Sequence, residues 1–192
     1  MQSTSAYLLY LFVVSRSAPA VLIRLVNTLQ HLKNQKNMHT NAEFHQYLHH
    51  VLEEKIPFCK LLGMKLTDLN ADHPKLTIHK QPELIGNFSQ GMLHGGVIAS
   101  VLDSIGAVGV LLKMAQQTPR QTAMEQVAEF AQMSTIDLRI DFLKPARGDV
   151  FIASAEVTRL GRRVANVLMQ MHDEEGVRIA TGAAAFILHG KG

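Results

Sequence analysis

The chain has 192 residues, 47% apolar and 18% charged, a composition typical of a globular domain that excludes wholesale disorder. A single cysteine, Cys59, excludes an internal disulfide framework, and no Cys/His spacing predicts a zinc site, so we expect no metal and a reducing, cytoplasmic setting. The net charge of +3 divides into +4 over residues 1–37 and −1 over 38–192, so the second segment lacks the dense basic stripe that nucleic-acid binding needs.

Residues 1–37 are predicted to be an N-terminal extension, followed by one domain over 38–192. The apolar run 6–14 is too short to span a bilayer, and no Lys or Arg precedes it as in a signal peptide. The extension fits an upstream segment with translation starting at Met38, a membrane-surface anchor or a poor signal peptide. We favour the first alternative, because everything after Met38 has the pattern of a complete domain.

The domain is predicted to begin with a helix over 41–55. Thr40 and Glu43 have the spacing of a capping box, and Pro57 ends the helical pattern. Two short strands are expected next, over 60–69 and 74–80, separated by a turn.

The segment 93–114 is apolar and long enough to be a membrane-spanning helix. Asp103 lies at its middle, however, and an unpaired carboxylate in lipid is unfavourable. A helix enclosed by a sheet would be apolar on every side for a different reason. We therefore predict a buried central helix and no stable membrane insertion.

The rest of the chain reads as a loop over 118–133, with a helical turn or two, and then a strand meander. The segment 134–146 alternates strictly, as a half-buried strand does, with one face formed by Ile136, Leu138, Ile140 and Phe142 and the other by Thr135, Asp137, Arg139 and Asp141. Further strands are expected over 149–160, 164–173 and 177–188, joined by tight turns. One long helix and one long antiparallel sheet predict an α+β fold in which the sheet curls around the helix.

Residues 86–96, GNFSQGMLHGG, form a polar, glycine-rich approach to the start of this helix. The first turn of a helix has unpaired N–H groups, and Gly95 and Gly96 leave them open to a carbonyl oxygen. Asp103 is the only ionisable side chain between His94 and Lys113, and a buried carboxylate facing a cleft is a candidate base or nucleophile. Glycines that merely ease packing, and a structural carboxylate, remain the alternatives at this point.

The spacing of these residues limits how they can act together. His94 and Asp103 are nine residues apart, which is about 13.5 Å along a helix, and nine steps of about 100° place them on opposite faces. The Asp103 of one chain therefore cannot serve a carbonyl held by the Gly95 of the same chain. If both residues act in one reaction, two subunits share the site.

The segment 87–103, NFSQGMLHGGVIASVLD, resembles the signature of the PaaI-like hotdog thioesterases, in which Asn, His-Gly-Gly and an Asp nine residues after the His mark the active site. The segments 135–146 and 160–188 also resemble strands of that family, so the resemblance covers about residues 42–188. Within the family the chain looks most like the YigI-type acyl-CoA thioesterases. The resemblance implies a hotdog fold, hydrolysis of medium- or long-chain acyl-CoA, no cofactor, and a homodimer or dimer of dimers with sites between protomers.

The resemblance also implies roles for individual residues. Asp103 matches the aspartate that attacks the thioester or activates water, and Gly95 matches the residue whose N–H polarises the carbonyl. His94 matches the histidine that shapes this turn and contacts the thioester region. Asn87 matches the asparagine that orients water or the attacking carboxylate, although the gap from Asn to His is one residue longer here than in some members. Thr135 falls where the family often has a Ser or Thr that assists the water.

Coenzyme A carries phosphates, so basic side chains are expected near its site. The candidates are Arg162 and Arg163 in the turn LGRR, together with Lys144 and Arg147. The alternative to an enzyme is a catalytically silent hotdog module that binds acyl-CoA. The presence of Asp103 favours the enzyme.

Overall fold

The computed structural model describes residues 27–28, 42–117, 122–128 and 132–188. Residues 42–50 are helical and lead into a π-helical turn, η1. Thr40, and with it the predicted capping box, lies outside the described residues. So does the predicted domain boundary at residue 37, which stays a prediction. The elements that follow residue 50 are η1 (Val51–Lys55), α3 (Pro57–Leu61), β1 (Lys65–Asp68), β2 (Lys75–His79), η2 (Pro82–Leu84), β3 (Ile85–Asn87), β4 (Met92–Leu93), α4 (Gly95–Gln117), α5 (Ala123–Ala128), β5 (Met133–Phe142), β6 (Val150–Leu160), β7 (Val164–Asp173) and β8 (Arg178–Leu188).

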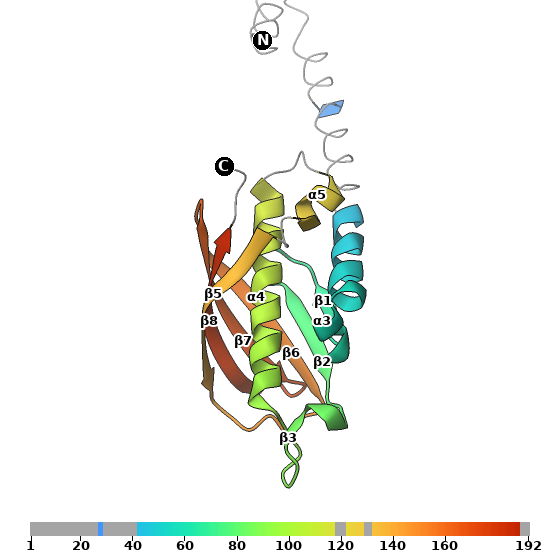
Figure 1. The fold of residues 1–192 in the computed structure, drawn as a ribbon, viewed down its shortest axis with the longest axis vertical. Helices are drawn as coiled ribbons and strands as arrows, with labels where there is room; N and C mark the ends of the chain where they lie inside the picture. Colours follow the sequence, from blue (N-terminus) through green and yellow to red (C-terminus); the bar gives the residue numbers. More distant parts are fainter. Residues whose placement is uncertain (1–26, 29–41, 118–121, 129–131, 189–192) are drawn as a thin grey trace, which may run out of the picture. The chain divides into compact units, whose positions relative to one another are not determined.

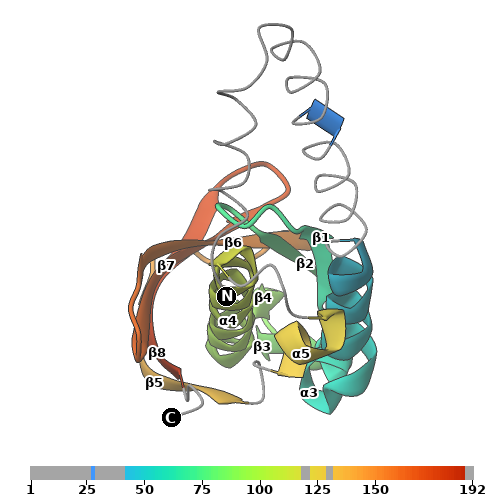
Figure 2. The ribbon, with the colours of Figure 1, turned by 90° about the horizontal axis from the view of Figure 1, so that it is seen from above.

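A six-stranded antiparallel sheet curves around α4, in the order β1-β2-β6-β7-β8-β5 (Figures 1 and 2). The hairpin of β3 and β4 lies below the start of α4 in Figure 1. On the side of α4 away from β7 and β8, Figure 2 shows α3 and α5. The predicted α+β plan and the strand meander from β6 to β8 are confirmed.

Burial of most of its length explains why α4 is largely apolar. It passes by length and composition as a membrane span, with a mean hydropathy of 1.9, yet most of that stretch is buried in the fold. Val101, Leu102 and Ile105 are each 0% exposed. At Gly106 an added Cβ would lie 2.7 Å from the Met169 sulfur, so the glycine lets the sheet approach the helix. The predicted buried central helix is confirmed.

The segment between the first helix and β1 differs from the prediction. A strand over 60–69 is wrong for its first half, because α3 occupies Pro57–Leu61 and β1 begins only at Lys65. Pro57 begins a helix here, since its fixed φ suits the first helical position and its missing N–H is not needed there. Gly63, with φ +63°, then ends α3 in the left-handed conformation that glycine adopts without strain.

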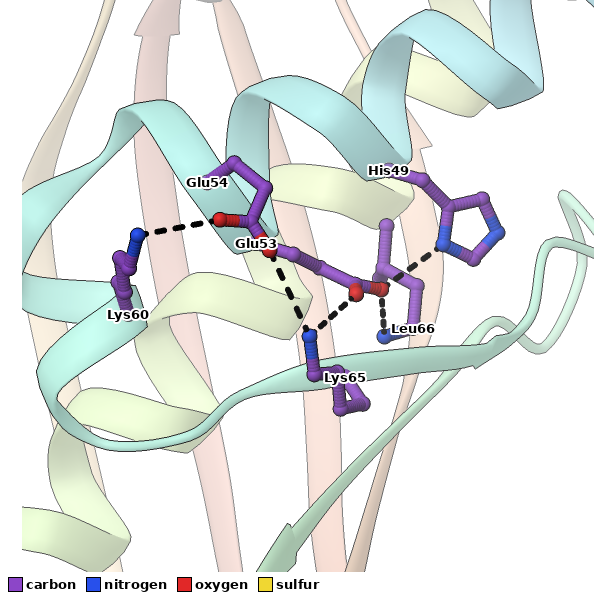
Figure 3. Close-up of polar contacts among 6 residues, drawn as sticks. All are labelled: His49, Glu53, Glu54, Lys60, Lys65 and Leu66. Atoms are coloured by element: carbon purple, nitrogen blue, oxygen red, sulfur yellow. Dashed lines mark hydrogen bonds and ion pairs between the residues drawn. The ribbon is translucent and has the colours of Figure 1, made fainter.

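A carboxylate fastens the η1 turn to β1 (Figure 3). Glu53 accepts hydrogen bonds from the Leu66 N–H at 3.0 Å and from Lys65 Nζ at 2.8 Å, and pairs with His49 Nδ1 at 2.8 Å. Burial raises the pKa of Glu53, but the bonds to Lys65, His49 and Leu66 outweigh it and hold the pKa below its usual value. The turn that carries Leu52 is therefore held against the sheet edge.

Strand β5 lies at one edge of the sheet and differs from the predicted alternation in two details. A bulge between Thr135 and Asp137 moves Thr135 onto the face of Leu138, where the sequence pattern had placed Ile136. The strand is also less buried in the single chain than predicted, since three of its apolar side chains stay exposed and Ile140 is only partly buried: Ile136 (55%), Leu138 (37%) and Phe142 (57%). It ends at Phe142, because the Leu143 and Lys144 N–H groups both turn to the Ile179 carbonyl.

Candidate active site

The first turn of α4 presents one free backbone donor. The Gly96 N–H donates to Nδ1 of His94 at 2.9 Å, whereas the Gly95 N–H has no acceptor within the described part of the chain. Because that bond uses the Nδ1 lone pair, a neutral His94 ring carries its proton on Nε2. Gly95 is thus the residue whose N–H can polarise a carbonyl, at the positive end of the helix dipole.

Gly86 on β3 sets the position of His94. A Cβ added at Gly86 would lie 2.6 Å from the His94 Cα, so only glycine permits this approach. The His94 N–H donates to the Leu84 carbonyl at 2.8 Å, and the neighbouring Leu93 N–H donates to Ala146 at 3.0 Å. Gly86 was not singled out in the sequence as a site residue, because nothing in the pattern shows that β3 folds back onto His94.

Asn87 lies in the same hairpin and shapes its loop. Its Oδ1 accepts hydrogen bonds from Ser89 Oγ at 2.8 Å and from the Gln90 N–H at 3.2 Å. The structure places His94, Gly95 and Gly96 together at the start of α4, whereas Asn87 pairs with Met92 in the hairpin and its side chain bonds only within that loop among the described residues.

Asp103 lies two turns further along α4 and pairs with β5. Thr135 Oγ1 donates to Asp103 Oδ1 at 2.9 Å. Burial raises the pKa of Asp103, while the hydrogen bond from Thr135 lowers it, and the net effect is a pKa above the usual value. A carboxylate that holds protons more tightly is a better proton acceptor once it is ionised. The bulge in β5 makes this pair possible, because it points Thr135 at the helix.

A pocket of about 210 Å³ opens beside Asp103 and Thr135. Its walls come from three places: α4, the segment from η1 to α3, and the adjoining strands β5 and β8. Apart from Asp103, Thr135, Ser104 and Cys59, the lining side chains are hydrocarbon or thioether groups. The Asp103 carboxylate is the one charged group among these lining side chains.

The two parts of the site are separated within one chain. Gly95 and Asp103 both belong to the continuous helix α4, eight residues apart, which is about 12 Å at 1.5 Å per residue. Each part also touches a different end of β5, since Thr135 bonds Asp103 while the Phe142 ring lies 3.3 Å from a Cβ added at Gly95. Within the described residues, no cluster of three His, Cys, Asp or Glu side chains could hold a metal ion.

Comparison with known proteins gives the family. Residues 90–180 match the family described as the thioesterase superfamily. The medium/long-chain acyl-CoA thioesterase YigI of Escherichia coli K12 is 37% identical over 135 residues, which cover 69% of this chain and 86% of that protein. The YigI of Salmonella typhimurium LT2 is 36% identical over the same length. The chain belongs to the thioesterase superfamily.

The solved structures agree with this assignment. A crystal structure from Shewanella oneidensis, described as related to the thioesterase superfamily, has a TM-score of 0.71 and 35% identity, covering 77% of this chain and 96% of that one. The predicted family, hotdog fold and class of enzyme, a thioester hydrolase, are confirmed. The roles of individual residues stay predictions, argued below from the geometry.

The four basic residues predicted for coenzyme A divide into two pairs in this thioesterase. Arg163 is next to the end of β8, where its carbonyl accepts from the Leu188 N–H at 2.8 Å. Lys144 is next to the beginning of β8, where its N–H donates to Ile179 at 3.2 Å. These ends are nine residues apart along an extended strand, which is about 30 Å. In one chain, therefore, Arg162 and Arg163 lie far from Lys144 and Arg147.

Proposed function

We propose that the protein hydrolyses medium- and long-chain acyl-CoA to the free acid and coenzyme A. The observation that carries the proposal is the Asp103–Thr135 pair at the mouth of an apolar pocket. The similarity to YigI, which is named for medium/long-chain acyl-CoA, supports this choice of substrate.

The chemistry follows from the two ends of the site. The Gly95 N–H binds the thioester carbonyl oxygen and stabilises the negative charge that forms on it. Asp103 either takes a proton from a water that attacks the carbonyl carbon, or attacks that carbon itself to form an anhydride that water then hydrolyses. Thr135 holds the carboxylate, and the C–S bond breaks to release the coenzyme A thiolate, which takes up a proton.

This reaction requires two subunits, because reacting groups must meet within about 3–3.5 Å and one chain holds Gly95 and Asp103 about 12 Å apart. Strand β5 offers a way to join them. Its outer edge has no neighbouring strand among the described residues, and three of its apolar side chains are exposed. Antiparallel pairing of two β5 strands about a two-fold axis would set the Thr135 end of one strand beside the Phe142 end of the other. Asp103 of one subunit would then approach Gly95 of its partner.

The same pairing would bring the basic residues together. Lys144 and Arg147 follow the Phe142 end of β5, and the Ala146 carbonyl between them accepts from Leu93, close to Gly95. Arg163 lies near the Thr135 end, because Leu188 pairs with Met133 on β5. One subunit would therefore supply Lys144 and Arg147, and the other Arg162 and Arg163, to the phosphates of one coenzyme A. We propose a homodimer, or a dimer of dimers, in the cytoplasm.

Complementation between two inactive variants tests the shared site. Asp103→Asn removes the base, and Gly95→Pro removes the polarising N–H at a helix position that tolerates proline. When the two are unfolded, mixed equally and refolded, about a quarter of wild-type activity should return, since half the dimers are mixed and each has one intact site of two. Acyl-CoA hydrolysis is followed with a thiol-reactive dye.

Two controls make this result decisive. Gly95→Ala keeps the N–H and adds only a methyl group near Phe142, so it should keep far more activity than Gly95→Pro. Asp103→Asn and Gly95→Pro, each refolded alone, must form dimers and remain inactive. Mixed dimers without activity would contradict the shared site. A wild-type protein that binds acyl-CoA but does not hydrolyse it would instead support the silent binding module.

A further inference from the structure

The pocket beside Asp103 has a mouth and a floor. At the mouth, Phe58 is 52% exposed and Thr135 is also exposed. At the floor, Leu52, Cys59 and Phe186 are only 1%, 5% and 1% exposed. A group that enters the pocket beside the carboxylate therefore meets side chains that are otherwise buried from solvent.

The floor offers almost nothing for water to bind. Besides Asp103 and Thr135, the polar side chains that line the pocket are Cys59 and Ser104. Leu52 and Phe186 present only hydrocarbon. A space lined mainly by hydrocarbon suits an apolar ligand, because a water bound there needs two to four polar partners.

The floor is also rigidly built. A Cβ on Gly106 would lie 3.2 Å from the Phe186 Cζ, so the ring is seated on the bare backbone of α4. On the opposite wall, Leu52 belongs to the η1 turn that Glu53 fastens to β1 (Figure 3). Movement of Phe186 or of the η1 turn away from the pocket would disrupt these contacts.

We infer that the floor of this pocket, formed by Leu52, Cys59 and Phe186, sets the longest acyl chain that the enzyme accepts. The inference rests on the proposed function. The carbonyl would lie beside Asp103, and the alkyl chain would pack against the buried side chains of the floor. An acyl chain that is too short to reach the floor leaves part of the pocket empty. A longer acyl chain must push the floor side chains aside.

Removal of the Phe186 ring tests the inference. In Phe186→Ala, we compare the acyl-CoA one step longer than the best wild-type substrate with that best substrate. The ratio of their kcat/KM values should rise by about 10-fold, the scale of one methylene in an apolar pocket. The measurement is kcat/KM across saturated acyl-CoAs from butanoyl to palmitoyl. Phe151→Ala is the matched control, since Phe151 is also fully buried in the sheet but does not line the pocket. It should lose stability without a change in chain-length profile.

The opposite change should shorten the preferred chain. Cys59→Leu adds bulk at the floor and should lower kcat/KM for the longest good substrates by about 10-fold, with butanoyl-CoA little affected. Cys59→Ala, which adds none, should leave long substrates accepted. If neither Phe186→Ala nor Cys59→Leu moves the profile, the inference is wrong while the proposed function stands. Absence of hydrolysis by the wild-type protein would remove the proposed function itself.

The thiol at the floor gives a readout that does not depend on catalysis. In Asp103→Asn, long-chain acyl-CoA should protect Cys59 from methyl methanethiosulfonate at least about 10-fold better than acetyl-CoA does, because only the long chain reaches the floor. Equal protection by acetyl-CoA and long-chain acyl-CoA would overturn the inference.

Discussion

Two turns of the same helix, about 12 Å apart, are built in opposite ways. The first turn of α4 is polar and open, with bare glycine backbone and a free Gly95 N–H. The turn at Asp103 is half-buried beside an apolar pocket, and its carboxylate has one hydrogen-bond donor, Thr135. The first environment favours negative charge, whereas the second makes it costly.

This contrast suits a hydrolase that works in pairs. A thioester carbonyl gains negative charge in the transition state and belongs at the first turn. A base belongs where burial raises its pKa, which is the second turn. Because one helix cannot bring its own two turns together, each subunit of the proposed dimer would offer one half of two sites. The predictions below change one half at a time.

Loss of the carboxylate should have the largest effect. Asp103→Asn keeps the shape of the side chain and can still accept the Thr135 hydrogen bond, but it cannot take a proton. We expect kcat for acyl-CoA to fall by at least ~10²-fold, with an unchanged dimer. Activity is measured by thiol release and dimerisation by light scattering. A folded dimer with near-wild-type kcat would exclude Asp103 from the mechanism.

Charge reversal of the two basic pairs tests whether residues of both subunits bind the same coenzyme A molecule. Arg162→Glu with Arg163→Glu, and separately Lys144→Glu with Arg147→Glu, should each raise KM for acyl-CoA by about 10-fold, the scale of a lost contact to a charged group. Acyl-N-acetylcysteamine, which lacks the nucleotide, is the control substrate and should be little affected. An effect of only one pair would place the phosphates within a single subunit.

Much of the fold could be predicted from local pattern. The strands 149–160, 164–173 and 177–188 alternate over long stretches and appear as β6, β7 and β8 with ends displaced by at most one residue. The apolar segment around Asp103 is the buried helix α4. The strand predicted over 60–69 was wrong because Pro57 can begin a helix as well as end one.

The site could be predicted only in part from the sequence. Asp103 stands out as the lone charge in an apolar helix, and His94 and the glycines mark its start. Three features depend on distant segments and leave no local signal: the contact of Gly86 with His94, the bulge that turns Thr135 inwards, and the pocket closed by Phe186. The exposure of β5 was missed too, because alternation shows which face is apolar but not what covers it.

Substitution of Thr135 is expected to have a smaller effect, and it alters only the part of the site around Asp103. Thr135→Ala removes the hydrogen bond that lowers the pKa of Asp103, so the pKa should rise further. Since the reaction needs the ionised carboxylate, the acidic limb of the kcat/KM profile should move to higher pH, with a fall of about 2–10-fold at neutral pH. Thr135→Ser should restore both values. An acidic limb that stays in place would show that Thr135 does not hold the carboxylate in the working enzyme.

The smallest effect expected is on stability, and its sign follows from the direction of the Asp103 pKa. In the folded chain this pKa is raised above its unfolded value, so the native state holds the proton more tightly. As pH rises through the window between the unfolded and folded values, stability falls, and above that window the full cost of the buried charge remains. Asp103→Asn should therefore raise Tm by a few degrees at pH 7, and the gain should vanish below about pH 4, where both states are protonated. Glu156→Gln is the control, because Glu156 is exposed on β6, away from the proposed β5 interface, and it should show no such gain. A lower Tm for Asp103→Asn at neutral pH would mean that the ionised carboxylate is stabilised in the fold, which contradicts the contrast between the two turns.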